Sequence, residues 1–306
     1  MSTTPTGRRA WTEVRVTVPD GWGELVADLF GTAPFGGVAF GPASLATPPA
    51  PTGHDYLRAY VPSELDDEAL RVRVRGDLDR LAEATGAAEL ADLELRFHPL
   101  PEEDWANSWK TTWRAFRCGD LAVVPRHIDG ALRPTDRRLV LDPGGVFGTG
   151  RHATTRTCLK VLQERLAGGE RVLDAGCGTG ILAAGALLSG AASVVGFDID
   201  PGAPRHVAEL LEDNGLTGRM AFRSGGFEVL ADDERFDVVV ANIYSDVISA
   251  HAGDLRRALA PDGWFAFSGC PVHHARETRA VIEQAGLAVE EQRVRGLWHT
   301  FVGRRA

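Results

Sequence analysis

The 306-residue sequence predicts an α/β protein in which a doubly wound parallel sheet follows a smaller α+β domain. From residue 171 onward, short apolar segments alternate with longer amphipathic ones, as in parallel strands joined by helices. Residues 11–98 carry a shorter and different succession of strand and helix patterns. The chain is also long enough to bury two cores. Together these observations predict two domains of different architecture.

The first domain is expected at residues 11–98. Its segment EVRVTV alternates as a half-buried strand does, and a later segment carries one apolar stripe at helical spacing. The predicted elements are strands at 13–18, 37–40, 55–61 and 91–97 and helices at 21–30 and 65–84, the stripe being Leu70, Val74, Leu78 and Leu81. This order, βαββαβ, is typical of a ferredoxin-like α+β domain.

Two segments flank the first domain. Residues 1–10 have no apolar stretch and are expected to form a disordered tail rather than a signal peptide. Residues 99–113 are predicted to form a linker helix in which Trp105 and Trp109 are one turn apart. Tryptophans at that spacing favour packing between domains over a ligand platform.

The second domain is expected at residues 114–306. Apolar segments such as RVLDA and FDVVVAN are strands of the central sheet, and turn residues end each intervening helix. The predicted strands are 171–175, 193–198, 236–242, 264–269, 287–296 and 297–305, and the predicted helices are 181–188, 203–213, 247–259 and 272–284. The last two strands are expected to form an antiparallel edge.

Composition excludes several classes of protein. A net charge of −9 disfavours direct nucleic-acid binding, which requires a basic surface. No apolar run reaches the length of a membrane span, so no membrane association is expected and the predicted location is cytoplasmic. The four cysteines lack the spacing of a zinc site or a disulfide framework, so no metal is predicted.

A glycine-rich loop, GCGTG, joins a predicted strand to a predicted helix at residues 176–180. Glycines there let the backbone turn tightly and approach a ligand. The pattern alone also fits a dinucleotide loop or a structural turn. Asp174, just before the loop, would repel a pyrophosphate but suits a cation, and Asp198 ends the next strand where a carboxylate can bind ribose hydroxyls. The cofactor favoured is therefore S-adenosylmethionine, which carries cationic groups and no phosphate.

A second glycine-rich segment, DPGGVFGTGRH, spans residues 142–152. It resembles a P-loop but has Arg151 and His152 where a P-loop has Lys and Ser or Thr. It also comes before the predicted strand at 171–175, whereas a P-loop directly follows a strand. We expect it to fold over the methionine end of the cofactor, with Phe147 and Gly148 in contact with it.

These motifs are similar to those of a known family. The segments DWANSWK, LDPGGVFGTGRHATTRTCL, VLDAGCGTGILAAGALLSGAASVVGFDIDP and DVVVANI resemble, in order and spacing, the bacterial PrmA family that methylates ribosomal large-subunit protein eleven. The resemblance runs from Trp11 to the C-terminus. It implies a class I S-adenosylmethionine-dependent methyltransferase with a seven-stranded Rossmann-like sheet, and a first domain that recognises the protein substrate. It also implies transfer of methyl groups to lysine side chains, an N-terminal amine, or both.

The resemblance assigns cofactor contacts to Thr155, Gly176, Asp198 and Asn242, and Gly178 belongs to the same loop. Thr155 is expected at a helix start, where its hydroxyl and nearby N–H groups can hold the cofactor carboxylate. Asn242 is expected at a strand end beside the transferred methyl group. The candidate catalytic residues are therefore Asn242, His152 and Tyr244.

Three positions depart from the family pattern: Arg151, Ala153 and Tyr244. His152 either handles a proton or anchors the loop, Arg151 either lowers the pKa of a substrate lysine or points into solvent, and Tyr244 either lines the amine site or packs under the loop. The departures leave the identity of the methylated protein open. The expected protein is a monomer; the alternatives are the same chemistry on a non-ribosomal protein, a nicotinamide-dependent oxidoreductase and a non-catalytic RNA-binding protein.

Overall fold

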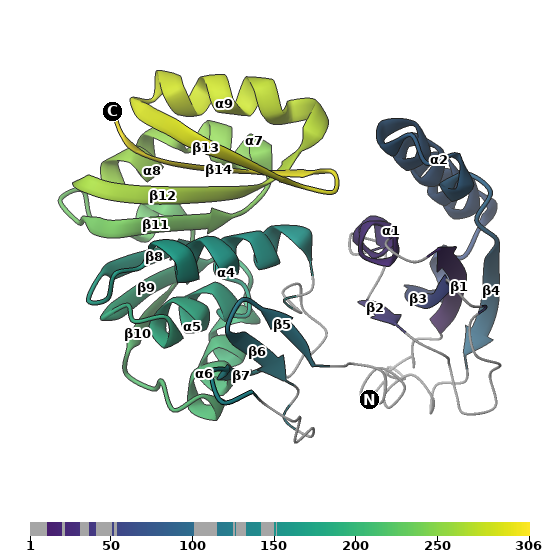
Figure 1. The fold of residues 1–306 in the computed structure, drawn as a ribbon, viewed down its shortest axis with the longest axis horizontal. Coiled ribbons are helices and arrows are strands. Elements are labelled where there is room, and N and C mark those ends of the chain that lie inside the picture. Colours follow the sequence, from purple (N-terminus) through teal and green to yellow (C-terminus); the bar gives the residue numbers. More distant parts are fainter. Residues whose placement is uncertain are drawn as a thin grey trace, which may run out of the picture. The chain divides into compact units, whose positions relative to one another are not determined.

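The computed structural model describes residues 11–19, 22–30, 37–40, 51, 54–100, 115–124, 126, 133–141, 150 and 152–306. The chain divides into two compact units, Met1–Arg114 and Ala115–Ala306 (Figure 1). The linker helix expected at 99–113 falls largely outside the described residues, as do Phe147, Gly148 and Arg151. No helix in the described part of the chain combines the length and apolar character of a membrane span.

The first unit has the element order βαββαβ that the sequence predicts. Its elements are β1 (Trp11–Pro19), α1 (Gly23–Phe30), β2 (Gly37–Phe40), β3 (His54–Pro62), α2 (Glu68–Thr85) and β4 (Leu95–Leu100), with 3-10 turns η1 (Ser63–Leu65) and η2 (Ala88–Leu90). The four strands pair antiparallel in the order β2-β3-β1-β4. The apolar stripe predicted on α2 is buried, and the helix begins at Asp67, whose side chain accepts a hydrogen bond from the Leu70 N–H.

The last strand of this unit was misplaced by the sequence pattern. It was expected at 91–97 but begins at Leu95 and continues through Pro99, which pairs with Thr12. Proline lacks the N–H that a central strand needs, so it suggested an end to the strand. Because β4 lies at the edge of the sheet, however, the missing donor is tolerated.

The second unit contains a seven-stranded sheet in the order β10-β9-β8-β11-β12-β14-β13. Its strands are β8 (Arg171–Ala175), β9 (Ser193–Asp198), β10 (Met220–Ser224), β11 (Phe236–Asn242), β12 (Leu259–Pro271), β13 (Leu287–Arg295) and β14 (Trp298–Arg305). β14 runs antiparallel to both of its neighbours, which confirms the predicted antiparallel pair. The other strand pairs are parallel. The doubly wound fold class is therefore confirmed.

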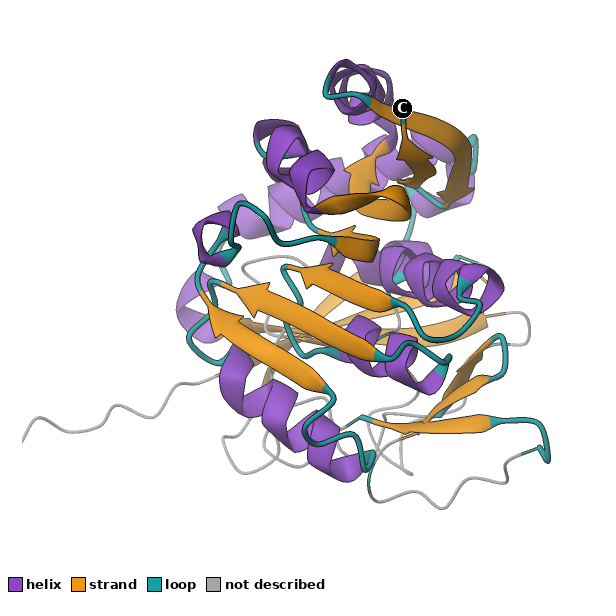
Figure 2. Ribbon diagram, turned by 90° about the vertical axis from the view of Figure 1, so that its left-hand side faces the viewer, coloured by secondary structure: helices purple, strands orange, loops and turns teal. Residues whose placement is uncertain are grey.

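Helices cover both faces of this sheet (Figure 2). They are α4 (Ala153–Arg165), α5 (Ile181–Leu188), α6 (Ala203–Asp213), α7 (Ser245–Ala250), α8 (Ala252–Ala258) and α9 (Ala275–Gln284), with 3-10 turns η3 (Phe227–Val229) and η4 (Val272–His274). α5 packs against α4 and α6, and α7 packs against α8 and α9. One core beneath them includes Leu173, Val239, Phe265, Phe267 and Phe301, all fully buried.

Two helix predictions in this unit were wrong in detail. The single helix expected at 247–259 is broken at His251, whose backbone leaves the helical conformation (φ −113°) while its ring stacks on Phe227 at 4.2 Å. Residues 261–263, expected to end that helix, lie in β12, where the ladder with β11 shifts register. Such irregularities accommodate proline in a strand. The helix expected from 272 begins at Ala275, after η4.

A small three-stranded sheet precedes α4 and was not predicted. It consists of β5 (Phe116–Cys118), β6 (Leu121–Val124) and β7 (Arg137–Val140). The Gln163 side chain on α4 bonds the backbone of Cys118 and Asp120, and the Asn214 amide after α6 bonds both backbone groups of Val140. These contacts fix the small sheet to the helices beside the central sheet.

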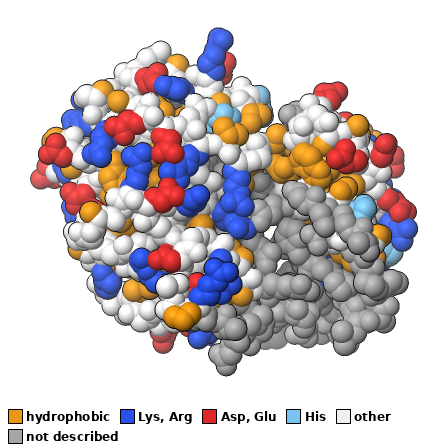
Figure 3. Space-filling view, viewed as in Figure 1, with side chains coloured by type: hydrophobic (Ala, Val, Ile, Leu, Met, Phe, Trp, Pro, Cys, Tyr) orange, Lys and Arg blue, Asp and Glu red, His pale blue; other side chains and the backbone are white. Residues whose placement is uncertain are grey.

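Charges of both signs are interspersed over the face of the second unit that Figure 3 shows. Between α4 and β13, Arg165 lies 3.0 Å from Glu291, and Arg293 lies 2.7 Å from Glu164. Partly exposed pairs of this kind each contribute little to stability. Their main consequence is that neighbouring surface charges compensate one another.

Candidate active site

The candidate site lies where the order of the large sheet reverses. β8 and β11 are neighbours, yet the chain leaves β8 toward β9 on one side and continues from β11 toward β12 on the other. Loops diverge at such a point, so the carboxyl ends of the two strands leave a place for a ligand. The predicted site residues Gly176 and Asn242 follow and end these two strands, respectively.

The loop after β8 is held in a shape that glycine alone adopts readily. Gly176, Gly178 and Gly180 have φ values of 70°, 52° and 82°, in the left-handed region. The N–H groups of Gly176 and Cys177 both donate to the Phe197 carbonyl at 3.0 Å, which fastens the loop to β9. A Cβ atom at Gly176 would lie 2.4 Å from Cγ2 of Ile243. Glycine is therefore required here both by backbone conformation and by a neighbouring side chain.

Asp174, at the end of β8, is fully buried. Its Oδ2 accepts a hydrogen bond from the Ala183 N–H at 3.0 Å, whereas Oδ1 has no hydrogen-bond partner among the described residues. Burial raises the pKa of this carboxyl to about 7. A cation bound beside the glycine loop would compensate the charge and keep the group ionised, so the site fits a cofactor that carries positive charge.

Asp198 is half-buried at the end of β9, and backbone N–H groups of the glycine loop and of the segment after β9 fix its two oxygens. Oδ2 accepts from the Gly178 N–H at 2.6 Å and Oδ1 from the Asp200 N–H at 2.8 Å. A carboxylate oxygen can accept more than one hydrogen bond, so both retain capacity for ribose hydroxyls. The next residue, Ile199, has 82% of its surface exposed, which is unusual for a large apolar side chain.

The first turn of α4 is capped by His152. Its Nδ1 accepts from the Thr154 N–H at 3.3 Å and lies 2.6 Å from the Thr154 hydroxyl. Accepting a backbone N–H requires an unprotonated Nδ1, and burial lowers the pKa of His152 to about 4. The ring also meets Trp298 edge-on at 5.0 Å. His152 is therefore neutral near pH 7 and occupies a capping position.

Thr155, on the same turn, connects α4 to β11. It is buried, and its hydroxyl oxygen accepts a hydrogen bond from Asn242 Nδ2 at 3.2 Å. This bond fixes the orientation of the amide and leaves Oδ1 of Asn242 as an acceptor. Tyr244 lies two residues further on, 59% exposed, at the start of α7.

The structure thus brings most of the predicted site residues to one edge of the sheet. Three residues with a place in this site were missed by the sequence reasoning: Ile199, Ile243 and Trp298. Ile199 has a signal in the sequence, because an apolar residue directly follows the predicted ribose carboxylate. Trp298 meets His152 only through the β13–β14 hairpin, a contact between residues 146 positions apart that no local pattern reveals.

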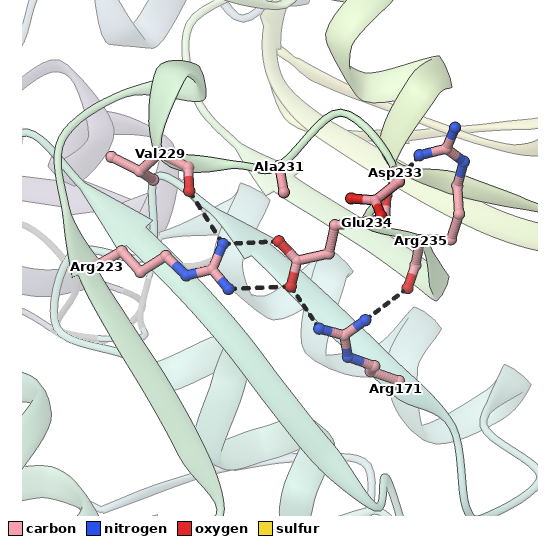
Figure 4. Close-up of a pocket in the computed structure, with 7 residues that line it drawn as sticks. All are labelled: Arg171, Arg223, Val229, Ala231, Asp233, Glu234 and Arg235. Atoms are coloured by element: carbon pink, nitrogen blue, oxygen red, sulfur yellow. Dashed lines mark hydrogen bonds and ion pairs between the residues drawn. The ribbon is translucent and has the colours of Figure 1, made fainter.

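A second polar cluster lines a shallow hollow on the same unit (Figure 4). Glu234 lies between two guanidinium groups there: it accepts from Arg223 at 2.7 and 2.9 Å and also from Arg171. Arg223 reaches the Val229 carbonyl as well, and Arg171 reaches that of Arg235. Because these charges already have partners, we interpret the cluster as structural.

The fold and the site together define a class I S-adenosylmethionine-dependent methyltransferase. The profile of the family described as "Ribosomal protein L11 methyltransferase (PrmA)" matches residues 10–306, and the chain belongs to that family. The resemblance noted from its motifs is thereby confirmed, as are the enzyme class and the cofactor, S-adenosylmethionine.

Individual relatives agree with this assignment. The chain is similar to the ribosomal protein L11 methyltransferase of Pelotomaculum thermopropionicum, with 35% identity over 310 residues that cover 96% of this chain and 98% of the relative. It is similar to that of Desulfosudis oleivorans, with 35% identity over 286 residues and 92% of each chain covered. The crystal structure of ribosomal protein L11 methylase from Lactobacillus delbrueckii subsp. bulgaricus resembles it with a TM-score of 0.59 and 26% identity, over 63% of this chain and 99% of that one.

Proposed function

We propose that this enzyme transfers methyl groups from S-adenosylmethionine to amino groups of a ribosomal large-subunit protein, the counterpart of the L11 protein in its relatives' names. The acceptors are lysine side chains, an N-terminal amine, or both. The observation that carries the proposal is the fixed amide of Asn242, which stands at the switch point one residue from Ile243, the neighbour of the cofactor loop. It offers a hydrogen-bond acceptor for an amine beside the place for the methyl donor.

The residues around the glycine loop would hold the cofactor. The Gly176 and Gly178 backbone approaches its methionine part, Asp198 accepts from the ribose hydroxyls, and Ile199 offers an apolar face to the adenine. Thr155 and the first turn of α4 receive its carboxylate. Phe147 and Gly148 complete this assignment from the segment before α4. When bound, S-adenosylmethionine supplies an already activated methyl group, so the protein mainly has to align the amine with it.

The acceptor amine must lose its proton before it reacts. Deprotonating a free lysine at pH 7 costs roughly 4–5 kcal/mol, from its usual pKa of about 10.4. Partial burial near Asn242 lowers the pKa of such an amine, and Asn242 Oδ1 can accept one of its N–H groups. His152 adds no charge here because it is neutral, so we assign it to positioning through Thr154 and α4. Tyr244 offers an aromatic face beside the incoming cationic side chain.

The remaining assignments concern the rest of the chain. We place the substrate-recognition domain at 11–98, the linker at 99–113 and the catalytic domain at 114–306. A ribosomal substrate implies a cytoplasmic enzyme. We also propose that the protein is a monomer. A ribosomal protein also gives the N-terminal domain a folded partner to recognise.

The proposal is tested with ribosomes from a strain that lacks this gene. Purified wild-type enzyme and S-adenosylmethionine with a labelled methyl group are added, and the labelled proteins are identified by mass spectrometry. Label on lysine or N-terminal nitrogen of one large-subunit protein is expected. Asn242→Ala, which also removes a proposed cofactor contact, should reduce it at least tenfold at saturating S-adenosylmethionine. Label confined to a non-ribosomal protein in a parallel whole-extract reaction would overturn the assigned substrate.

A further inference from the structure

Ile243 lies between two residues of the candidate site, Asn242 and Tyr244, and its main chain rests on β12. Its N–H donates to the Ser268 carbonyl at 3.2 Å. Its carbonyl group lies directly over Gly269, where a Cβ atom would be 2.2 Å from the oxygen and 2.8 Å from the carbon of Ile243. Gly269 has a φ of +93°, a conformation that glycine adopts far more readily than other residues. The backbone of Ile243 therefore occupies the space that a side chain at 269 would fill.

The side chain of Ile243 makes the corresponding contact on the other side. Its Cγ2 methyl lies against Gly176, where a Cβ atom would be 2.4 Å away, and the rest of the side chain packs on the apolar core. Two glycines on different loops thus make room for one residue. Ile243 has main-chain contact with β12 on one side and side-chain contact with the cofactor loop on the other.

This arrangement couples the position of the Gly176 loop to that of the Asn242 amide. Packed protein interiors have little free volume, so a displacement of one group moves its neighbours. A shift of the Gly176 loop would move Ile243, and with it the acceptor amide of Asn242 that precedes it in the chain. Transfer between two bound groups is sensitive to displacements of about 1 Å, which can change a rate by a factor of the order of 100.

We propose that Ile243 is a positioning residue whose Cγ2 methyl sets the separation between the methyl donor on the Gly176 loop and the acceptor amine at Asn242. This inference rests on the function proposed above. Ile243 acts through Gly176 and Asn242 and is not itself assigned a contact with the reacting atoms. A merely structural role predicts a loss of stability alone, whereas a spacer predicts a loss of turnover.

The branching of the side chain provides the test. Valine retains the Cγ2 methyl that touches Gly176 and lacks only the terminal carbon. Leucine keeps the volume of isoleucine, but its side chain branches at Cγ instead of Cβ. It therefore has no methyl group in the position of Cγ2, and the contact with Gly176 is lost. The matched control is Ile248→Leu, the same isomeric change at a fully buried core position on α7.

For each variant, kcat and KM for the protein substrate, the S-adenosylmethionine Kd and the thermal unfolding midpoint are measured on the full-length enzyme. I243L should lower kcat at least tenfold at saturating substrate and cofactor, with both KM and Kd within about threefold of wild type. I243V should recover most of the lost kcat. I248L should lower the unfolding midpoint at least as much as I243L does, because Ile248 is fully buried and Ile243 only partly, while its kcat stays within about twofold.

Two outcomes would overturn the inference, and they can be told apart. If the wild-type enzyme transfers methyl groups normally and I243L keeps the kcat of I248L, Ile243 is a packing residue and the inference alone fails. If the wild-type enzyme binds S-adenosylmethionine but methylates no protein amine, the proposed function fails and takes the inference with it.

Discussion

Two carboxylates in the second unit, Glu234 and Asp174, have little exposed surface but opposite electrostatic surroundings. Glu234 lies between the guanidinium groups of Arg223 and Arg171, and these bonds lower its pKa. Asp174 has one backbone N–H as its partner and one oxygen with none among the described residues, and burial raises its pKa to about 7. One carboxylate is compensated by the protein itself and the other is not.

This contrast distinguishes a structural cluster from a binding site. The Glu234 cluster contains more charges and lines a surface hollow, yet it offers little to a ligand because its hydrogen bonds are already made. The Asp174 region has fewer charges, but its carboxylate is buried without a compensating positive charge. A cationic ligand can supply that charge. An uncompensated group of this kind is a stronger indication of function than the number of charges in a cluster.

The largest effect on cofactor binding is expected from Asp198→Ala. Removing the carboxylate takes away both proposed ribose hydrogen bonds, each worth about 1.5–3 kcal/mol to a charged acceptor. The S-adenosylmethionine Kd should rise at least about 100-fold by calorimetric titration. Glu234→Gln, on the compensated side of the comparison, should leave that Kd within twofold. Unchanged affinity in Asp198→Ala would show that the ribose lies elsewhere.

Asp174→Asn should have a smaller effect on binding, about tenfold, because it removes charge but keeps the side chain's size and its bond with Ala183. The apo protein should respond in a pH-dependent way. A folded-state pKa of about 7, above the ordinary value of 3.8, means that the folded protein binds more protons than the unfolded chain between these limits. The wild type therefore loses stability from this group as the pH rises from about 4 to 7.

The free energy of unfolding of Asp174→Asn minus that of wild type should accordingly increase between pH 4 and 7 and level off above. Urea unfolding at a series of pH values measures it. A saturating amount of S-adenosylmethionine should flatten the curve, because a neighbouring cation lowers the pKa of Asp174. A difference that does not vary with pH would mean that the Asp174 pKa is not raised.

Glu234→Gln tests the compensated cluster by its effect on stability. The substitution leaves two guanidinium groups with weaker partners, and the free energy of unfolding should fall by about 1–2 kcal/mol. Because Arg171 and Arg223 are partly exposed, a larger loss is not expected. Urea unfolding at pH 7 checks this value. A loss of cofactor affinity comparable to that of Asp174→Asn would contradict the structural interpretation of the cluster.

The sequence predicted the fold where burial is strongest. β8, β9 and β11 were placed to the residue, because their apolar runs are bounded by charged or turn residues. β10 was missed, because this edge strand, MAFRS, is partly exposed throughout and has no fully buried position. The small sheet was missed for a different reason. β6 is fully buried, but β5, β6 and β7 have only three or four residues each, too few to show a pattern. Side-chain contacts from Gln163 and Asn214 hold β5 and β7 in place.

The sequence predicts those site residues whose type and place in the chain are enough to suggest a role. Asp198 follows from its place at a strand end, and the glycines follow from the turn that they form. Ile243 could not be found in this way, because its importance lies in two glycines 67 residues before it and 26 residues after it. The sequence leaves His152 as either a proton carrier or an anchor. The hydrogen bond from the Thr154 N–H and the lowered pKa of the ring favour the anchor, and neither can be read from the sequence.

The titration of His152 is expected to change stability with pH in the direction opposite to that of Asp174. The folded-state pKa of His152 is about 4, below its ordinary value of 6.5, so the unfolded chain binds more protons between these limits. This contribution to stability is present above pH 6.5 and is lost as the pH falls toward 4. His152→Asn keeps a side chain that caps helices and removes the titration, whereas His152→Ala removes the cap and should cost about 1 kcal/mol. The free energy of unfolding of the Asn variant minus that of wild type should therefore be larger at pH 5 than at pH 8, as measured by urea unfolding. The Ala variant should be less stable than the Asn variant at both pH values.

If His152 instead carried the proton in catalysis, the Asn variant would lose nearly all its turnover at pH 8 with an unchanged S-adenosylmethionine Kd, and the positioning role would be wrong.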